Sequence, residues 1–252
     1  MTGVAELLDG PLDDEAALRG NLRDLTRLNR WLGGTRASRR ALDRLLSGRT
    51  VPHTVLDVGT GAADIPLALL GAASRSGGRL HVTGVDSRQE VLDAARAVDP
   101  RIDRTPDLVL ALSDGRLLPW PDRSFDVVHA SLLVHHLEPP DALAFLREAA
   151  RIARLGVVVN DLVRARRHLF VARLLLPLVT RNRFTRHDAP LSVRRAYTRM
   201  ELRALLAGAA LRPVAEVGAL GGHRVAIAAV PMRELEQQRS SAAPADDRAA
   251  AT

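Results

Sequence analysis

Three aspartates lie at or just after the ends of apolar runs that are typical of buried strands. Asp57 lies in the run that ends at Val58, Asp86 ends a second run, and Asp114 follows a third. Open parallel sheets bind their ligands beside the carboxyl ends of the strands. The three carboxylates are therefore candidate ligand-binding groups.

The turn after Asp57 is rich in glycine and leads into a helix. Gly59 and Gly61 permit backbone dihedrals and a close backbone approach that a Cβ would block, and Pro66 fits an early helical position. The chain contains no lysine, which excludes the phosphate loop G-x-x-x-x-G-K-[ST]. Asp64 would repel a pyrophosphate, and Asp57 likewise suits a ligand without phosphate, for instance one that carries an ammonium group.

Two motifs resemble those of one family. Asp57-x-Gly59-x-Gly61 is similar to the first motif of class I S-adenosylmethionine (SAM)-dependent methyltransferases, which usually have a third glycine where this chain has Ala63. The segment 118–128, LPWPDRSFDVV, closely resembles the family's LPxPDxSFDVV, which leads into the fourth strand, and 144–154 resembles its ALxExxRIxR helix. The resemblance covers roughly residues 51 to 161.

The resemblance implies SAM as the cofactor and S-adenosylhomocysteine as its product. Asp86 would accept hydrogen bonds from the ribose hydroxyls, a device that NAD enzymes share, and Asp114 would face the adenine amino group. A helix N-cap for Asp86 and a turn aspartate for Asp114 are the structural alternatives. The expected cofactor-binding residues are Asp57, Gly59, Thr60, Gly61, Asp86, Ser87, Asp114, Gly115 and Ser131.

Three histidines are candidates for a general base. Methyl transfer to a phenol leaves a proton that an imidazole with a pKa of about 6.5 can take. His135 and His136 follow the fourth expected strand, where the family's acceptor pocket begins, and His187 lies further along. We favour His135 as the base, with Asp161 to orient it, and a structural or cofactor-loop role for His136. Adjacent histidines cannot both face one metal from a regular strand or helix, so we expect no metal site.

Strand patterns that alternate with helical patterns predict an α/β fold with a parallel sheet. The resemblance implies a Rossmann-like sheet of seven mostly parallel strands in the order 3-2-1-4-5-7-6. Residues 1–50 are expected to form helices that either cap the ligand or pack on the sheet. The methyltransferase domain is expected over 51–232, with a helical insertion over 162–198, and 233–252 is expected to be a disordered tail.

Composition excludes several classes of protein. All 36 basic residues are arginine, the net charge is +7 and aromatic residues make up 3%, so a stacking platform for single-stranded nucleic acid is not expected. The chain has no run of about 18 apolar residues that would span a membrane, and its N-terminus lacks the pattern of a signal peptide. The absence of cysteine removes disulfides and favours the cytoplasm.

The expected activity is methylation of a small molecule. The insertion resembles that of bacterial methyltransferases associated with polyketide synthesis, which favours O-methylation of a phenolic or polyketide-like acceptor. Apolar residues of the insertion, including Leu174 and Leu175, are expected to line the acceptor pocket. C-methylation of a quinone precursor and a non-catalytic SAM-fold binding protein are the alternatives, whereas a nucleic-acid methyltransferase is disfavoured. The expected assembly is a monomer or homodimer.

Overall fold

The computed structural model describes residues 6–10, 14–49 and 52–233 of the 252-residue chain. Its centre is a seven-stranded sheet with the strand order β3-β2-β1-β4-β5-β7-β6, in which β7 runs antiparallel to both of its neighbours. This confirms the predicted α/β class and strand order. The strands are β1 (His53–Val58), β2 (Leu80–Asp86), β3 (Leu108–Leu112), β4 (Phe125–Ser131), β5 (Ala153–Leu162), β6 (Leu211–Gly218) and β7 (Arg224–Pro231).

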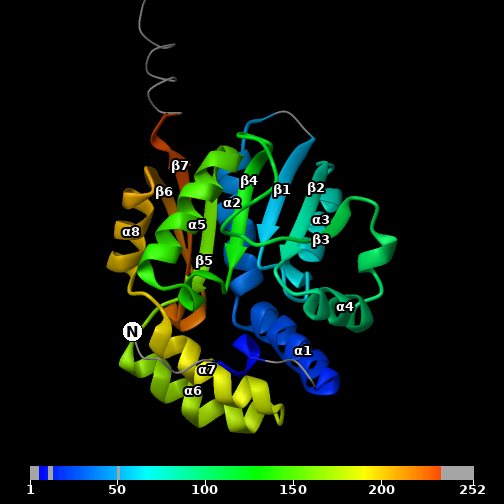
Figure 1. Ribbon diagram of the computed structural model, residues 1–252, viewed down its shortest axis with the longest axis vertical. Coiled ribbons are helices and arrows are strands. Elements are labelled where there is room, and N and C mark those ends of the chain that lie inside the picture. Colours follow the sequence, from blue (N-terminus) through cyan, green and yellow to red (C-terminus); the bar gives the residue numbers. More distant parts are fainter. Residues whose placement is uncertain (1–5, 11–13, 50–51, 234–252) are drawn as a thin grey trace, which may run out of the picture.

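Helices cover both faces of the sheet (Figure 1). One face packs against α5 and α8 through a core that includes Phe145, Leu146 and Leu202, and the other face packs against α2, α3 and α4. The helices are α1 (Glu15–Trp31), α2 (Gly34–Leu46), α3 (Asp64–Arg75), α4 (Gln89–Val98), α5 (Pro139–Ile152), α6 (Arg166–Val179), α7 (Arg183–Arg195) and α8 (Arg199–Gly208). Short 3-10 turns are η1 (Leu7–Asp9), η2 (Ile102–Arg104), η3 (Val134–His136) and η4 (Leu220–Gly222).

The two N-terminal helices have different positions. Gly33, with a φ of 85°, separates them. Helix α2 packs on β5, β6 and β7, whereas α1 packs on α4 and α7 at the carboxyl edge of the parallel strands. The sequence left two alternatives for these helices, which were packing on the sheet and capping the ligand. Helix α2 packs on the sheet, and α1 lies over the ligand-binding edge of the sheet.

The predicted insertion forms α6 and α7. Figure 1 shows both at the end of the molecule toward which the arrows of β1 and β4 point. Helix α6 packs on α7. Within the described ranges, no helix is long and apolar enough to cross a membrane. The predicted disordered tail, 233–252, begins with Arg233, which is ordered and donates to the carbonyl of Ala150 at 2.7 Å, so the expectation is wrong for this residue. The rest of the predicted tail, 234–252, lies outside the described residues.

Candidate functional site

A pocket of about 450 Å³ opens at the carboxyl edge of the parallel strands, between that edge and α1. Its volume lies within the range of about 300–1,000 Å³ that is usual for small-molecule sites. All nine residues predicted to bind the cofactor line it: Asp57, Gly59, Thr60, Gly61, Asp86, Ser87, Asp114, Gly115 and Ser131. Helix α1 adds Leu18, Asn21, Leu22, Leu25 and Asn29 to the wall.

The glycine turn after β1 has a left-handed backbone at three alternate positions. Gly59, Gly61 and Ala63 have φ values of 70°, 52° and 52°. A Cβ on Gly59 would also lie 3.1 Å from Cδ1 of Leu133, across the pocket. Ala63 adopts a conformation that glycine adopts without strain, which accounts for the glycine that the related motif usually carries there. The turn therefore brings bare backbone to the pocket wall.

Both carboxylate oxygens of Asp57 are engaged by the protein itself. Asp57 and His129 are register partners on β1 and β4, and Oδ1 of Asp57 lies 2.5 Å from Nδ1 of His129. The hydroxyl of Thr60 donates to Oδ2 at 2.7 Å. Asp57 is thus in a position to hold the turn in place, in addition to facing the ligand as the sequence suggested.

Asp86 is held at the end of β2 with its carboxylate beside the glycine turn. The amides of Gly61 and Arg88 each donate to it at 3.2 Å. Burial raises the pKa of Asp86 above its ordinary value, and the backbone hydrogen bonds offset only part of this effect. A half-buried carboxylate with acceptor capacity to spare fits the paired hydroxyls of a ribose. The residues present at this edge therefore fit SAM.

Asp114 is more exposed than Asp86 and belongs to a local ion pair. Its carboxylate accepts hydrogen bonds from the guanidinium of Arg116, with the closest nitrogen at 2.8 Å. Side-chain and backbone hydrogen bonds from Arg116 hold the pKa of Asp114 below its ordinary value. The carboxylate is therefore ionised at neutral pH and can accept a hydrogen bond from an amino group.

A buried arginine, Arg224 on β7, joins α1 to the sheet beneath the pocket. Its Nε donates to Oδ1 of Asn160 at 2.7 Å, Nη1 donates to Oδ1 of Asn29 at 2.7 Å, and Nη2 donates to Ser131. Asn29 in turn donates to Asp64 at 3.0 Å. Burial lowers the pKa of Arg224 to about 10, and the negative charges of Asp161 and Asp64 offset part of that cost. We call these side chains, with Asp64, the Arg224 hub.

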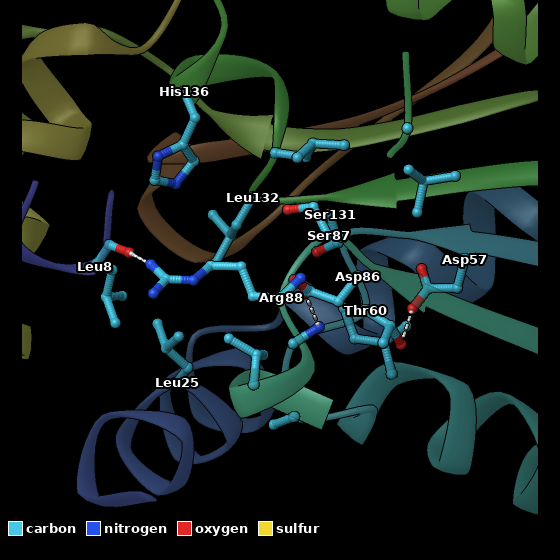
Figure 2. Close-up of a pocket in the computed structure, with 18 of the residues that line it drawn as sticks. Leu8, Leu25, Asp57, Thr60, Asp86, Ser87, Arg88, Ser131, Leu132 and His136 are labelled. Atoms are coloured by element: carbon cyan, nitrogen blue, oxygen red, sulfur yellow. Dashed lines mark hydrogen bonds between the residues drawn. The ribbon is translucent and has the colours of Figure 1, made fainter. Parts of the chain in front are cut away.

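The end of the pocket away from Asp57 is lined largely by leucines and also contains His136 and Arg88. Figure 2 shows His136 beyond Leu132, with Leu8 and Leu25 nearby. Leu133 and Leu137 also line this region. Leu132 has a φ of 55°, which places a bulky residue in a backbone conformation that it rarely adopts. Such strained residues cluster at ligand sites.

His136 lies next to a buried carboxylate from the N-terminal segment. Nε2 of His136 is 3.8 Å from Oε2 of Glu6, which is 3% exposed. The amides of Leu7 and Leu8 donate to Asp188 of α7 and so fix this segment. The Arg88 guanidinium donates to the carbonyl of Leu8 at 2.9 Å, as Figure 2 shows.

His135 and His187 are placed differently from His136. Nδ1 of His135 lies 2.6 Å from Oδ1 of Asp161, so these two residues do pair, but His135 is buried and the pocket lining does not include it. Burial alone would raise the pKa of Asp161, yet the charge and hydrogen bond of His135 outweigh it and lower that pKa. His187 contacts Asp188 at 2.8 Å and also lies outside the pocket lining.

The expectation that Leu174 and Leu175 line the acceptor pocket is wrong. They are 58% and 48% exposed on α6, and no described residue of 162–198 belongs to the pocket lining. The apolar wall comes instead from α1 and from the loop after β4. Sequence reasoning also missed Glu6, because the segment before α1 has no periodic pattern.

Glu6, His135 and His136 form a group whose candidate ligand atoms lie within 4.8 Å of one another. The argument from adjacency fails here, because the 3-10 turn η3 places the two imidazole rings 4.3 Å apart. A guanidinium nitrogen of Arg195 lies 4.0 Å from Oε1 of Glu6, and Ser192 donates to the same oxygen. This positive charge would repel a metal ion, so the group favours histidines beside a carboxylate over a metal site.

The known proteins that this chain resembles are methyltransferases. Residues 55–156 match the family described as "Methyltransferase domain". The 27-O-demethylrifamycin SV methyltransferase of Amycolatopsis mediterranei is 32% identical over 147 residues, which are 58% of this chain and 47% of that protein. The ubiquinone/menaquinone biosynthesis C-methyltransferase UbiE of Rickettsia bellii is 28% identical over 109 residues, which are 42% of this chain and 43% of that protein.

Among solved structures, a SAM-dependent methyltransferase from Aquifex aeolicus has the same fold. Its TM-score is 0.59 at 20% identity, and the match covers 84% of this chain and 97% of that one. The chain spans about half the length of the curated relatives that it matches.

Proposed function

We propose that this chain, which belongs to the class I SAM-dependent methyltransferases, methylates an oxygen of a small phenolic or polyketide-like molecule. One observation carries the proposal: a single pocket joins the cofactor-type edge, with Asp57, Asp86 and Asp114, to an end that is lined largely by leucines and contains His136. The relative in Amycolatopsis mediterranei is named for 27-O-demethylrifamycin SV, which supports oxygen as the acceptor atom.

Each part of the pocket has a distinct task in this proposal. Bound SAM supplies a methyl group made electrophilic by the positive sulfur. The Asp86 carboxylate holds the ribose, and the left-handed turn at Gly59 and Gly61 lets the backbone approach the ligand. Leu132 and Leu133 exclude water from the acceptor end, and positioning of the reactants alone can account for a large part of the rate.

His136 is the general base in this proposal. It lines the pocket, and Glu6 at 3.8 Å stabilises the imidazolium that forms when the acceptor hydroxyl loses its proton. The structure thus favours His136 over His135, whose imidazole is buried against Asp161. We assign His135 a positioning task, since its amide and ring both hold Asp161 and thereby fix the turn η3.

C-methylation of a quinone precursor is the second candidate, supported by the likeness to UbiE. The same pocket would serve it, because a carbon nucleophile next to a phenolic oxygen also needs a base. The acceptor atom therefore has to be determined from the product.

The test is a methylation assay with methyl-labelled SAM and a panel of phenols, polyketide-like phenols and quinone precursors. Mass spectrometry detects the labelled product, and NMR shows whether the label is bonded to oxygen or carbon. Label on carbon would replace the first candidate by the second. SAM binding without transfer to any acceptor would instead support a non-catalytic binding protein.

The matched control separates cofactor binding from chemistry. Asp86→Ala should weaken SAM binding by at least ~1.5 kcal/mol, because the ribose hydroxyls lose a charged acceptor. Asp93→Ala, at an exposed position on α4, should leave the affinity unchanged. Equal affinity of the Asp86 variant and the native protein in calorimetry would refute the ribose assignment.

A further inference from the structure

Helix α6 presents a continuous apolar stripe to solvent. Its residues follow the spacing i, i+1, i+4, i+5, i+8 and i+9, which places them in two neighbouring rows on one helix face. They are 48% to 80% exposed. The stripe consists of Phe170, Val171, Leu174, Leu175, Leu178 and Val179.

A surface helix of a globular protein normally turns its apolar stripe toward the core. Here α6 packs on α7, and within the described ranges the stripe faces outward. The residues after Arg233 contain one large aliphatic side chain, Leu235, so that segment is too polar to cover six apolar residues. An occupant from outside this chain suits the stripe better.

The segment that carries the stripe is basic, and the nearby acidic side chain Asp24 of α1 lines a small hollow next to Val179. Residues 162–187 contain seven arginines and no acidic residue. Arg164 and Arg183 pair with Glu201 and Asp14, whereas Arg166, Arg173 and Arg181 are exposed beside the stripe or just beyond it. An apolar face with an arginine border is complementary to an apolar layer with an anionic border.

A tryptophan extends this surface. Trp31, at the end of α1, is 65% exposed, and it lines a small hollow of about 50 Å³ together with Val179 and Thr180. Tryptophan is enriched where proteins meet the headgroup region of a bilayer. Figure 1 shows α6 and α1, which carry these residues, toward the end of the molecule at which the arrows of β1 and β4 point.

We propose that α6 docks on the surface of an anionic lipid bilayer. The stripe enters the boundary between headgroups and acyl chains, and Arg166, Arg173 and Arg181 contact the lipid phosphates. Trp31 lies at the headgroup level beside the end of α6. This surface does not depend on which molecule is methylated.

The test is vesicle binding by the full chain, with phosphatidylglycerol vesicles compared with phosphatidylcholine vesicles. The chain has two tryptophans, and Trp120 packs edge-on against Phe125 with ring centroids 5.4 Å apart. In a Trp120→Phe background the emission therefore reports Trp31. We expect co-sedimentation with phosphatidylglycerol vesicles, a blue shift of this emission, and weaker binding at about 1 M salt, where charges are screened beyond about 3 Å.

Variants connect this binding to α6. The double substitution Leu174→Glu and Leu178→Glu should weaken vesicle binding at least ~10-fold, because two aliphatic side chains that would enter the bilayer are lost. Met200→Glu, at a 79% exposed position on α8, is the matched control and should bind normally. SAM affinity serves as the folding check, since α6 is outside the pocket lining.

Three results would overturn the proposal. One is failure of the native chain to bind phosphatidylglycerol vesicles. Another is equal binding by the double variant and the Met200 control. The third is a concentration-dependent dimer of the native chain that the double variant does not form, together with no vesicle binding by either of these two proteins. This result would assign the stripe to contact with a second copy of the chain.

Discussion

Replacement of Arg224 by methionine tests whether the Arg224 hub fastens α1 to the sheet. Methionine keeps an unbranched side chain in the same space but removes every donor. Three acceptors that are buried or partly buried then lose their partner: Oδ1 of Asn160, Oδ1 of Asn29 and Oγ of Ser131. Asp64 and Asp161 also lose the cation that offsets their charge.

The expected loss follows from these contacts. Each buried acceptor left without a donor costs about 1–3 kcal/mol. The burial cost of the guanidinium disappears at the same time, and this offsets part of the loss. Removal of one partner from a buried charge network typically costs about 3–5 kcal/mol, which is the decrease in unfolding free energy that we expect for Arg224→Met.

Urea denaturation measures that decrease. The matched control is Arg212→Met at an exposed position on β6, whose unfolding free energy should stay within about 0.5 kcal/mol of that of the native protein. Hydrogen exchange supplies an independent measurement, because the amides of α1 should exchange faster when Asn29 is released. A loss below about 1 kcal/mol with unchanged exchange in α1 would refute the reasoning. Asn29 is itself a hydrogen-bond partner of Arg224, so the double variant Arg224→Met with Asn29→Ala should lose less than the two single losses combined.

Three further outcomes are expected at the pocket. Burial raises the pKa of Asp86, and protonation of this carboxylate removes the charged acceptor for the ribose. The SAM affinity measured by calorimetry should therefore fall on acidification, and the fall should begin at a higher pH than for an ordinary aspartate of pKa about 3.9. Asp86→Asn should eliminate this fall in affinity. His136→Ala should lower turnover of a phenol ~10²-fold with SAM affinity nearly unchanged. If this variant turns over normally and His187→Ala lowers turnover instead, the general base is His187 on α7. If α1 closes over the cofactor, SAM should slow hydrogen exchange in 15–31, and equal exchange with and without SAM would make α1 a fixed wall.

The sheet and its cofactor edge could be predicted because their signals are local. Strand patterns followed by Asp57, Asp86 and Asp114 lie within short windows, and the motif over 118–128 fixed the place of β4. The structure brings all nine expected cofactor residues to one pocket, although their ligation is still a prediction.

The acceptor end could not be predicted, because its determinants are far apart in the chain. The 3-10 turn η3 decides which of two adjacent histidines faces the pocket, and a single sequence gives no measure of that rotation. Glu6 reaches His136 from a segment without periodicity. Leu174 and Leu175 have the composition of a pocket wall, but composition does not distinguish an inward face from an outward one.

The contact between Arg224 and Asn29 also constrains the order in which the molecule assembles. The two residues are 195 positions apart, and Asn29 is synthesised long before β7. Helices α1 and α2 can form early, and α1 can pack on α4 before β7 exists, but α2 packs on β5 and β7, so its packing is complete only when the last described strand is present. During synthesis the apolar residues of α2, such as Leu42, therefore lack part of their cover until β7 has emerged, and in this interval the nascent protein needs protection from aggregation.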